Sequence, residues 1–299
     1  MRVPARLGRR PWVSTVLLVF LGPAELAAQE LETVVRGSSI GDSEDQLPAG
    51  RATGTVTQAD LERRLPRSTP DALRYVPGVS VQQTAHGQAS AYIRGLTGQQ
   101  TLLLVDGIRL NTSTWRQGPN QYAFTLDSQS LATLEVLRGG ASTRYGSDAI
   151  GGVISAQPLE PRIGQSGFEL HPLARGRFAT ADDERGGRLQ LEAIAGPTFG
   201  IIGGGGFRRV GLLESSGPVL NPADGQVPPV PRFLPDGRTQ RGTGFDEWTA
   251  DVRAVLRPAP DQSFTIASYL YRELNAPRTD QCPPPSARDD ECLVYLEQF

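Results

Sequence analysis

The sequence predicts an α+β domain followed by antiparallel β-strands of an incomplete transmembrane β-barrel. Three observations support this fold class. Helix-capping and turn signals alternate with short apolar stretches over residues 53–158, apolar residues recur with a period of two from about residue 167, and the later strands are joined by alternately short and long links. The 34 glycines and 24 prolines in 299 residues also suit many short strands and turns better than long helices.

The N-terminus has the pattern of an export signal over residues 1–28. Four arginines lie within residues 2–10, an apolar stretch covers residues 12–21, and small residues follow at 24–28. The alternative is a membrane anchor, but an apolar run of about ten residues is too short to span a bilayer. We therefore expect a cleaved signal peptide and an exported protein.

Composition and net charge limit the kinds of ligand that the protein is expected to bind. The formal net charge is −2, which argues against a protein that binds nucleic acid. Two cysteines and two histidines offer no zinc-ligand spacing, so no metal or cofactor is expected. The acidic clusters at residues 182–184 and 289–291 lack an ordered calcium-binding loop, and solvated turns are the favoured interpretation.

Local signals predict the elements of the domain at residues 53–158. Thr57 precedes Asp60 as in a helix N-cap, and Thr69-Pro70-Asp71 and Asp127 are further capping signals. Short strands are expected near residues 79–81, 91–94, 101–105 and 134–137. Asp106-Gly107 is the strongest hairpin signal in the chain.

The later strands are expected at residues 167–179, 187–196, 199–209, 244–257 and 263–273. In the second, Leu189 and Leu191 share one face while Arg188 and Gln190 share the other. Periodicity alone fits a soluble sandwich equally well. Tight turns near residues 197 and 260 alternate with a long link at 210–243, which favours an outer-membrane barrel. Five strands cannot close a barrel, so we expect residues 159–299 to be its N-terminal part and the protein to continue beyond Phe299.

Five ordered motifs lie within residues 57–157. They are PDALRYVPGV from Pro70, YIRG from Tyr92, LLVDGIRLN from Leu103, LEVLRG from Leu134 and YGSDAIGGVI from Tyr145. Together they resemble the plug domain of TonB-dependent outer-membrane receptors. Gly140 and residues 155–158 depart from the usual pattern without affecting the resemblance. The signal peptide before these motifs and the alternating strands after them fit the same family.

The resemblance implies a set of plug-motif residues: Arg94, Gly95, Asp106, Gly107, Arg138, Gly139, Tyr145, Gly146, Gly151 and Gly152. In such receptors the arginines face acidic groups across the interface between plug and barrel, whereas the alternative is a solvated charge at a strand end. The glycines are expected to serve tight turns or close backbone approach. Those at 203–206, in a barrel strand, would leave room for the plug.

The family resemblance also implies a function. The protein would bind a scarce extracellular ligand, such as a siderophore, haem or cobalamin, and import it into the periplasm without performing catalysis. The alternative is a non-transporting ligand-binding or adhesin-like remnant of the same architecture. Its surroundings would be outer-membrane lipid, and its energy would come from TonB of the inner-membrane complex.

Residues 29–52 are interpreted as a flexible arm with one apolar segment. This segment resembles the TonB box and consists of Leu31, Glu32, Thr33, Val34 and Val35. An extended, β-prone pentapeptide can add a strand to the edge of a partner's sheet, whereas the alternative is an ordinary linker.

Two further sites are expected in loops. By resemblance, the loop after the plug hairpin points toward the ligand, which makes candidates of Trp115, Arg116, Asn120 and Gln121, with simple loop packing as the alternative. Cys282 and Cys292 lie ten residues apart in a proline-rich segment of an exported protein. A local disulfide is expected there, against unpaired thiols or pairing with other cysteines.

Overall fold

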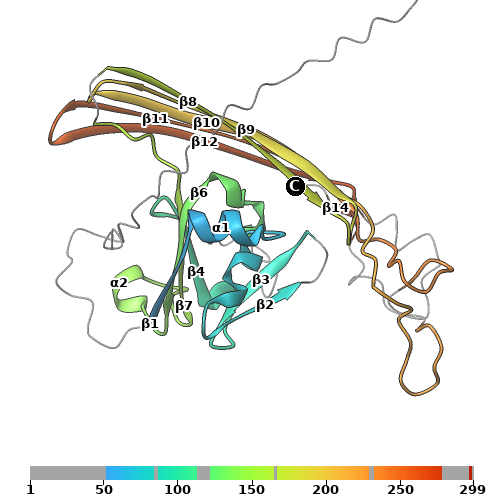
Figure 1. Ribbon diagram of the computed structural model, residues 1–299. Helices are drawn as coiled ribbons and strands as arrows, with labels where there is room; N and C mark the ends of the chain where they lie inside the picture. Colours follow the sequence, from blue (N-terminus) through green and yellow to red (C-terminus); the bar gives the residue numbers. More distant parts are fainter. Residues whose placement is uncertain are drawn as a thin grey trace, which may run out of the picture. The chain divides into compact units, whose positions relative to one another are not determined.

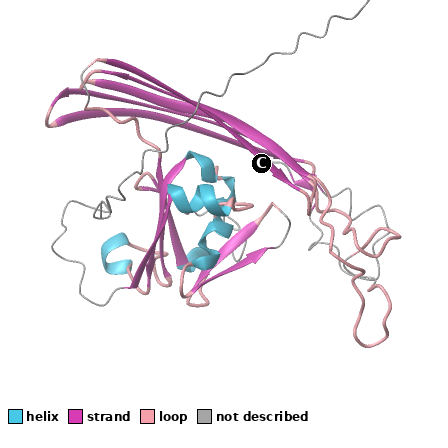
Figure 2. Ribbon diagram, in the orientation of Figure 1, coloured by secondary structure: helices cyan, strands magenta, loops and turns pink. Residues whose placement is uncertain are grey.

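The computed structural model describes residues 52–83, 87–112, 122–164, 167–228, 232–277 and 296–297, which form two principal sheets (Figures 1 and 2). The first sheet lies in the plug and the second follows it in sequence. Among these residues, none of the helices combines the length and the apolar character that crossing a membrane requires.

The plug sheet has the strand order β1-β6-β7-β4-β5. Its strands are β1 (Ala52–Thr57), β6 (Leu131–Arg138), β7 (Gly152–Pro158), β4 (Thr101–Val105) and β5 (Ile108–Arg109). Only β4 and β7 pair in parallel, and the other neighbours are antiparallel. A separate hairpin joins β2 (Val79–Gln83) to β3 (Ala89–Ile93).

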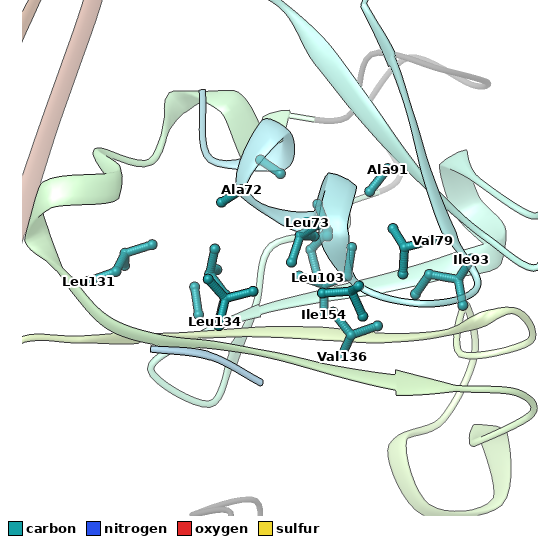
Figure 3. Packing of buried hydrophobic residues seen from close by; sticks show 14 of the residues in the cluster. Ala72, Leu73, Val79, Ala91, Ile93, Leu103, Leu131, Leu134, Val136 and Ile154 are labelled. Atoms are coloured by element: carbon teal, nitrogen blue, oxygen red, sulfur yellow. The ribbon is translucent and has the colours of Figure 1, made fainter. Parts of the chain in front are cut away.

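The helices of the plug are short. The α-helices are α1 (Gln58–Arg64) and α2 (Ser142–Tyr145), and the 3-10 turns are Pro70–Tyr75, Gly98–Gln100, Tyr122–Thr125 and Ser128–Ser130. The core packs the Pro70–Tyr75 turn and the β2–β3 hairpin against the sheet (Figure 3). Leu73, Leu103, Leu134 and Ile154 meet there, each at most 4% exposed. Burial of one such side chain stabilises the fold by about 1.5–3 kcal/mol.

The capping signals have different outcomes. The capping box of α1 is confirmed, because the Asp60 N–H donates to Thr57 Oγ1 at 3.2 Å and the Thr57 N–H donates to Asp60 Oδ2 at 3.1 Å. Asp127 caps the 3-10 turn after it by accepting from the Gln129 N–H at 2.8 Å. Thr69 is not a side-chain cap. Its hydroxyl instead donates to the Leu126 carbonyl at 2.5 Å, and a 3-10 turn follows it rather than an α-helix.

The second sheet has the order β12-β11-β10-β9-β8, with every neighbour antiparallel (Figure 1). Its strands are β8 (Phe168–Ala179), β9 (Glu184–Ala195), β10 (Phe199–Val210), β11 (Phe245–Ala259) and β12 (Gln262–Leu274). The five predicted strands are confirmed. A two-residue pair, β13 (Ala276–Pro277) with β14 (Leu296–Glu297), was not predicted.

The two faces of this sheet differ in character. Large apolar side chains on one face are exposed, for example Leu189 at 71% and Ile266 at 78%. On the opposite face, Arg188, Thr249 and Arg253 are buried at 2%, 8% and 6% exposure. The predicted alternation is thus present, and a bare apolar face suits contact with lipid.

Candidate functional site

Several predicted site residues lie outside the part of the chain that the structure describes. These are the TonB-box-like residues 31–35, the ligand candidates Trp115, Arg116, Asn120 and Gln121, and the cysteines Cys282 and Cys292. The plug-motif residues are described. The site that emerges is the boundary between the plug and the polar face of the second sheet, which we call the plug–wall interface.

The Asp106-Gly107 hairpin is formed as predicted. Val105 pairs with Ile108, which leaves two residues in the turn. Both have positive φ, 54° for Asp106 and 76° for Gly107, which is the backbone of a type I′ turn. The turn matters for the interface because it presents the Asp106 carboxylate to Arg253 of β11 at 2.5 Å.

Three other motif glycines, Gly139, Gly151 and Gly152, permit close approach. A Cβ on Gly152 would lie 2.2 Å from the Leu137 carbonyl oxygen, and one on Gly151 would lie 2.7 Å from Leu96 Cβ. Gly139 leaves room for the Arg94 guanidinium, whose Nη1 is 3.1 Å from the position of a Cβ. These residues are architectural, as the resemblance implied.

The motif arginines and Tyr145 make contacts within the plug itself. Arg138 donates to the carbonyl oxygens of Pro77 at 2.5 Å and Thr53 at 3.0 Å. Arg109 donates to the Tyr145 carbonyl at 2.9 Å, so it joins β5 to the end of α2 just before Gly146. The two hydrogen bonds of Arg138 thus lie within the plug. In the ion pairs described next, acids of the plug face arginines of the sheet.

The most buried of these ion pairs centres on Arg188 of β9, whose side chain is 1% exposed. It donates to Asp127 of the plug at 3.0 Å and to Asp251 of β11 at 2.5 Å. The Thr249 hydroxyl also donates to Asp127, at 2.8 Å. Asp127 thus caps its own 3-10 turn and holds the plug to two strands.

Glycines of β10 make this arrangement feasible. A Cβ on Gly204 would lie 2.6 Å from Arg188 Nη2, and one on Gly206 would lie 2.8 Å from Thr249 Oγ1. The glycine run was expected to leave room for the plug. It instead leaves room for the side chains that hold the plug, because Arg188 and Thr249 lie between β10 and Asp127.

A second group surrounds Arg208 of β10. Its guanidinium donates to Glu247 at 2.7 Å, to Glu184 at 3.3 Å and to the plug carbonyl of Arg67 at 2.8 Å. Glu184 is 2% exposed and also pairs with Arg177 at 2.6 Å. The expectation of a solvated turn at residues 182–184 is therefore wrong for Asp182, which is 3% exposed, and for Glu184, which the start of β9 turns toward these arginines.

The same group extends to the edge strand β12. The Tyr271 hydroxyl lies 3.0 Å from carboxylate oxygens of both Glu247 and Glu273. Glu273 is fully buried against the plug, where a Cβ on Gly87 would lie 2.6 Å from its Oε1. Within the described residues, no group of three or more His, Cys, Asp or Glu side chains is arranged to hold a metal ion.

The plug–wall interface therefore joins the two parts through buried, hydrogen-bonded charges. Its arginines, Arg188, Arg208 and Arg253, lie on the polar face of the sheet. The alternation of the sequence places Arg188 and its neighbours on a polar face but does not identify their partners. The detectable signal was arginine and acid at inward positions of neighbouring strands, whereas pairing with Asp127 or Arg67 required the tertiary structure.

Comparisons with known proteins agree with this geometry. A family model described as the TonB-dependent receptor plug domain matches residues 45–153. The iron-regulated outer membrane virulence protein of Vibrio cholerae is 41% identical over 142 residues, which cover 46% of this chain and 22% of that protein. The vitamin B12 transporter BtuB of Vibrio vulnificus is 35% identical over 140 residues, covering 45% and 22%.

Solved structures extend the likeness beyond the plug. The siderophore receptor PirA from Acinetobacter baumannii superposes with a TM-score of 0.54 at 19% identity, over 81% of this chain and 34% of that one. At this identity the match shows the fold alone. The part of the chain that matches the two curated relatives corresponds to 22% of the length of each.

Proposed function

Because this chain carries the plug domain of the TonB-dependent outer-membrane receptors, followed by a sheet with the fold of their barrel wall, we propose that it imports a scarce ligand. The ligand would be a siderophore, haem, cobalamin or a similar compound, and it would be carried into the periplasm. The relatives are named for iron regulation, vitamin B12 transport and siderophore reception, which supports this ligand class. An adhesin-like remnant without transport is the less favoured function.

The observation that carries this proposal is the separation of apolar and polar contacts. The main core consists of buried apolar residues between Val56 and Ala156, and all of them belong to the plug. Contacts to the sheet instead include charged pairs such as Asp127 with Arg188 and Asp106 with Arg253, beside the edge-to-face ring contact of Phe124 with Tyr271. Water can replace such hydrogen bonds at little net cost, whereas it cannot replace apolar packing. A plug held in this way can shift without losing its core.

Some buried polar atoms of the plug–wall interface also lack a hydrogen-bond partner among the described residues. The Nε atoms of Arg188, Arg208 and Arg253 are buried without a hydrogen-bond partner among the described residues. An unsatisfied buried donor costs about 1–3 kcal/mol, which lowers the barrier to moving the plug. The similar proteins are named as a transporter and a siderophore receptor, which supports a transport role without catalysis.

Energy would enter at the arm. We assign Leu31, Glu32, Thr33, Val34 and Val35 to TonB docking by strand addition, in which backbone hydrogen bonds carry the pull. Trp115, Arg116, Asn120 and Gln121 would contact the ligand through ring stacking and hydrogen bonds. Cys282 and Cys292 would form a disulfide that restrains an extracellular loop.

Deletion of residues 31–35 tests the proposal. The protein from its complete gene is expressed in a strain without its own receptors, and uptake and surface binding of radiolabelled ferric siderophores, haem and cobalamin are measured. We expect the deletion to abolish uptake and spare binding, because docking and capture use opposite faces. Deleting residues 40–44 of the same arm is the matched control and keeps uptake. Unchanged uptake without residues 31–35 would refute TonB-driven import.

A further inference from the structure

The face of the second sheet that carries Leu189 and Ile266, which we call the outward face, is apolar over most of its length. Strand register arranges its side chains in rows that cross all five strands (Figure 1). The row nearest the short turns consists of Phe168, Ala195, Phe199, Leu256 and Phe264. The next three rows contain no charged residue. Such a band, with aromatic rings at its border, suits the hydrocarbon layer of a membrane.

Aromatic rings also lie at the other border of this apolar band. The row there consists of Gly176, Gly187, Phe207, Trp248 and Arg272. The ring centroids of Phe207 and Trp248 are 4.4 Å apart. Phe199 and Phe207 are eight residues apart on β10, about 27 Å along a strand that crosses the membrane at a tilt. Side chains beyond the second ring border are therefore expected among lipid head groups.

Two arginines lie opposite each other in the row beyond this border. Arg185 of β9 is the register partner of Arg209 of β10, and their side chains are 68% and 67% exposed. Like charges directly opposite each other on neighbouring strands destabilise a sheet. An anion bound between the two guanidinium groups would remove that repulsion.

The acids beside these arginines leave donor groups for such an anion. Asp183 accepts from Nε and Nη2 of Arg185, so Nη1 has no partner among the described residues. Asp246 accepts only from Nε of Arg209, at 2.7 Å, which leaves both terminal nitrogens of that guanidinium. Arg272, in the neighbouring row, is exposed and forms no ion pair with a described acid. A phosphate group accepts several hydrogen bonds at once and suits the forked geometry of arginine.

The opposite border of the apolar band has no comparable group. Its described residues, 167–170, 195–199 and 256–264, contain one arginine, Arg257, with no second arginine opposite it. Arginines that cluster beside the aromatic rings of a single border favour a lipid head group over a soluble anion, because the acyl chains of the lipid would lie on the adjoining apolar band.

We propose that Arg185, Arg209 and Arg272 form a binding site for the phosphate of a membrane lipid. The phosphate lies between Arg185 and Arg209, and its acyl chains lie along the outward face. The site borders the long link at residues 211–244, so it selects phosphorylated lipid in the leaflet at that end of the strands. It is separate from the plug–wall interface, and it acts whether or not the protein imports a ligand.

Lipid titration tests the site. The protein from its complete gene is delipidated in neutral detergent and titrated with diphosphorylated lipid A, and native mass spectrometry measures the dissociation constant of the first bound lipid. We expect R185A/R209A to weaken binding about 25-fold, at about fivefold for each arginine. Removing both phosphates from the lipid should weaken its binding to the wild type. The double variant should distinguish the two lipids far less than the wild type does.

Single variants at the two borders provide the matched control. R209A should weaken binding of diphosphorylated lipid A about fivefold, whereas R257A removes the same charge at the other border and should keep the wild-type affinity. Inorganic phosphate at the concentration of the lipid should not displace it, because inorganic phosphate has no acyl chains.

Three results would overturn the site. They are equal wild-type affinity for lipid A with and without phosphates, equal affinity of R209A and R257A, and displacement of the lipid by inorganic phosphate, which would indicate a site for a soluble anion. The first needs no variant, so it decides the question even if a substitution impairs folding. None of these measurements involves uptake, so the proposed import function stands or fails separately.

Discussion

The guanidinium of Arg188 lies 3.0 Å from the carboxylate of Asp127, and this pair joins the second sheet to the plug at its most buried point. The two residues are far apart in sequence. Asp127 is fixed at the N-cap of a 3-10 turn, and Gly204 of β10 has no side chain that would occupy the space of the Arg188 guanidinium. Desolvated charges of this kind are costly unless both are paired. Their removal should therefore be measurable.

We expect R188A to destabilise the attached plug by about 3–5 kcal/mol, because it leaves Asp127 and Asp251 buried without a cation. D127A should cost less, since Arg188 keeps Asp251. Denaturant titration of the detergent-solubilised protein measures both. R209A, at an exposed ion pair, serves as the control and should leave stability nearly unchanged. Equal effects of R188A and R209A would contradict a buried role for Arg188.

The glycine run of β10 offers a matched pair of substitutions. G204A should destabilise by about 1–3 kcal/mol, because its Cβ would lie 2.6 Å from Arg188 Nη2 and 2.7 Å from the Leu189 carbonyl oxygen. G205A should be neutral or slightly stabilising, since its nearest contact would be an ordinary 3.6 Å. Thermal unfolding compares the two. A G204A protein as stable as G205A would show that Arg188 does not need this space.

The capping box of α1 predicts a dependence on pH. Hydrogen bonds from Thr57 lower the pKa of Asp60 below its usual value, so ionised Asp60 stabilises the folded state. We expect D60N to weaken hydrogen-exchange protection of α1 at neutral pH. This deficit should be full above about pH 4 and disappear as the pH falls through the lowered pKa, because wild-type Asp60 then becomes neutral as well.

T57A should reduce the same protection by about 1 kcal/mol, as expected for the loss of an N-cap. Thr55→Ala on the neighbouring strand changes the same residue type without a cap and should have little effect on α1. A deficit of D60N that persists at low pH would assign the effect to packing instead of charge.

Strand connections predict the orientation in the membrane. The long link after β10, residues 211–244, should lie outside the cell, and the tight turn after β11, residues 260–261, should face the periplasm. Protease added to intact cells should cut only within the long link. Cleavage at the turn instead, with the long link protected, would invert the orientation. Lysed cells provide the control that both sites can be cut.

The sequence alone determined many of the elements and their order, although β1, β7 and the β13–β14 pair were not predicted. Period-two alternation predicted β8 to β12 and placed Arg188 on the polar face, and Asp106-Gly107 predicted the turn between β4 and β5. These signals can be read from the sequence because they depend on residues close together in the chain. The ordered motifs identified the plug for the same reason. What was wrong or missing involved distant partners. Thr69 binds the Leu126 carbonyl instead of capping a helix, and Glu184 is buried between arginines instead of solvated.

Only the tertiary structure decided which charges meet. Arg188 finds Asp127, Arg253 finds Asp106 and Glu160, and Arg162 finds Glu192, all across long sequence separations. Any arginine on the polar face could pair with any acid of the plug as far as composition is concerned. Strand register, the space left by Gly200 and Gly204, and the exclusion of water from the interface select among these pairs, and each of these is a property of the assembled fold.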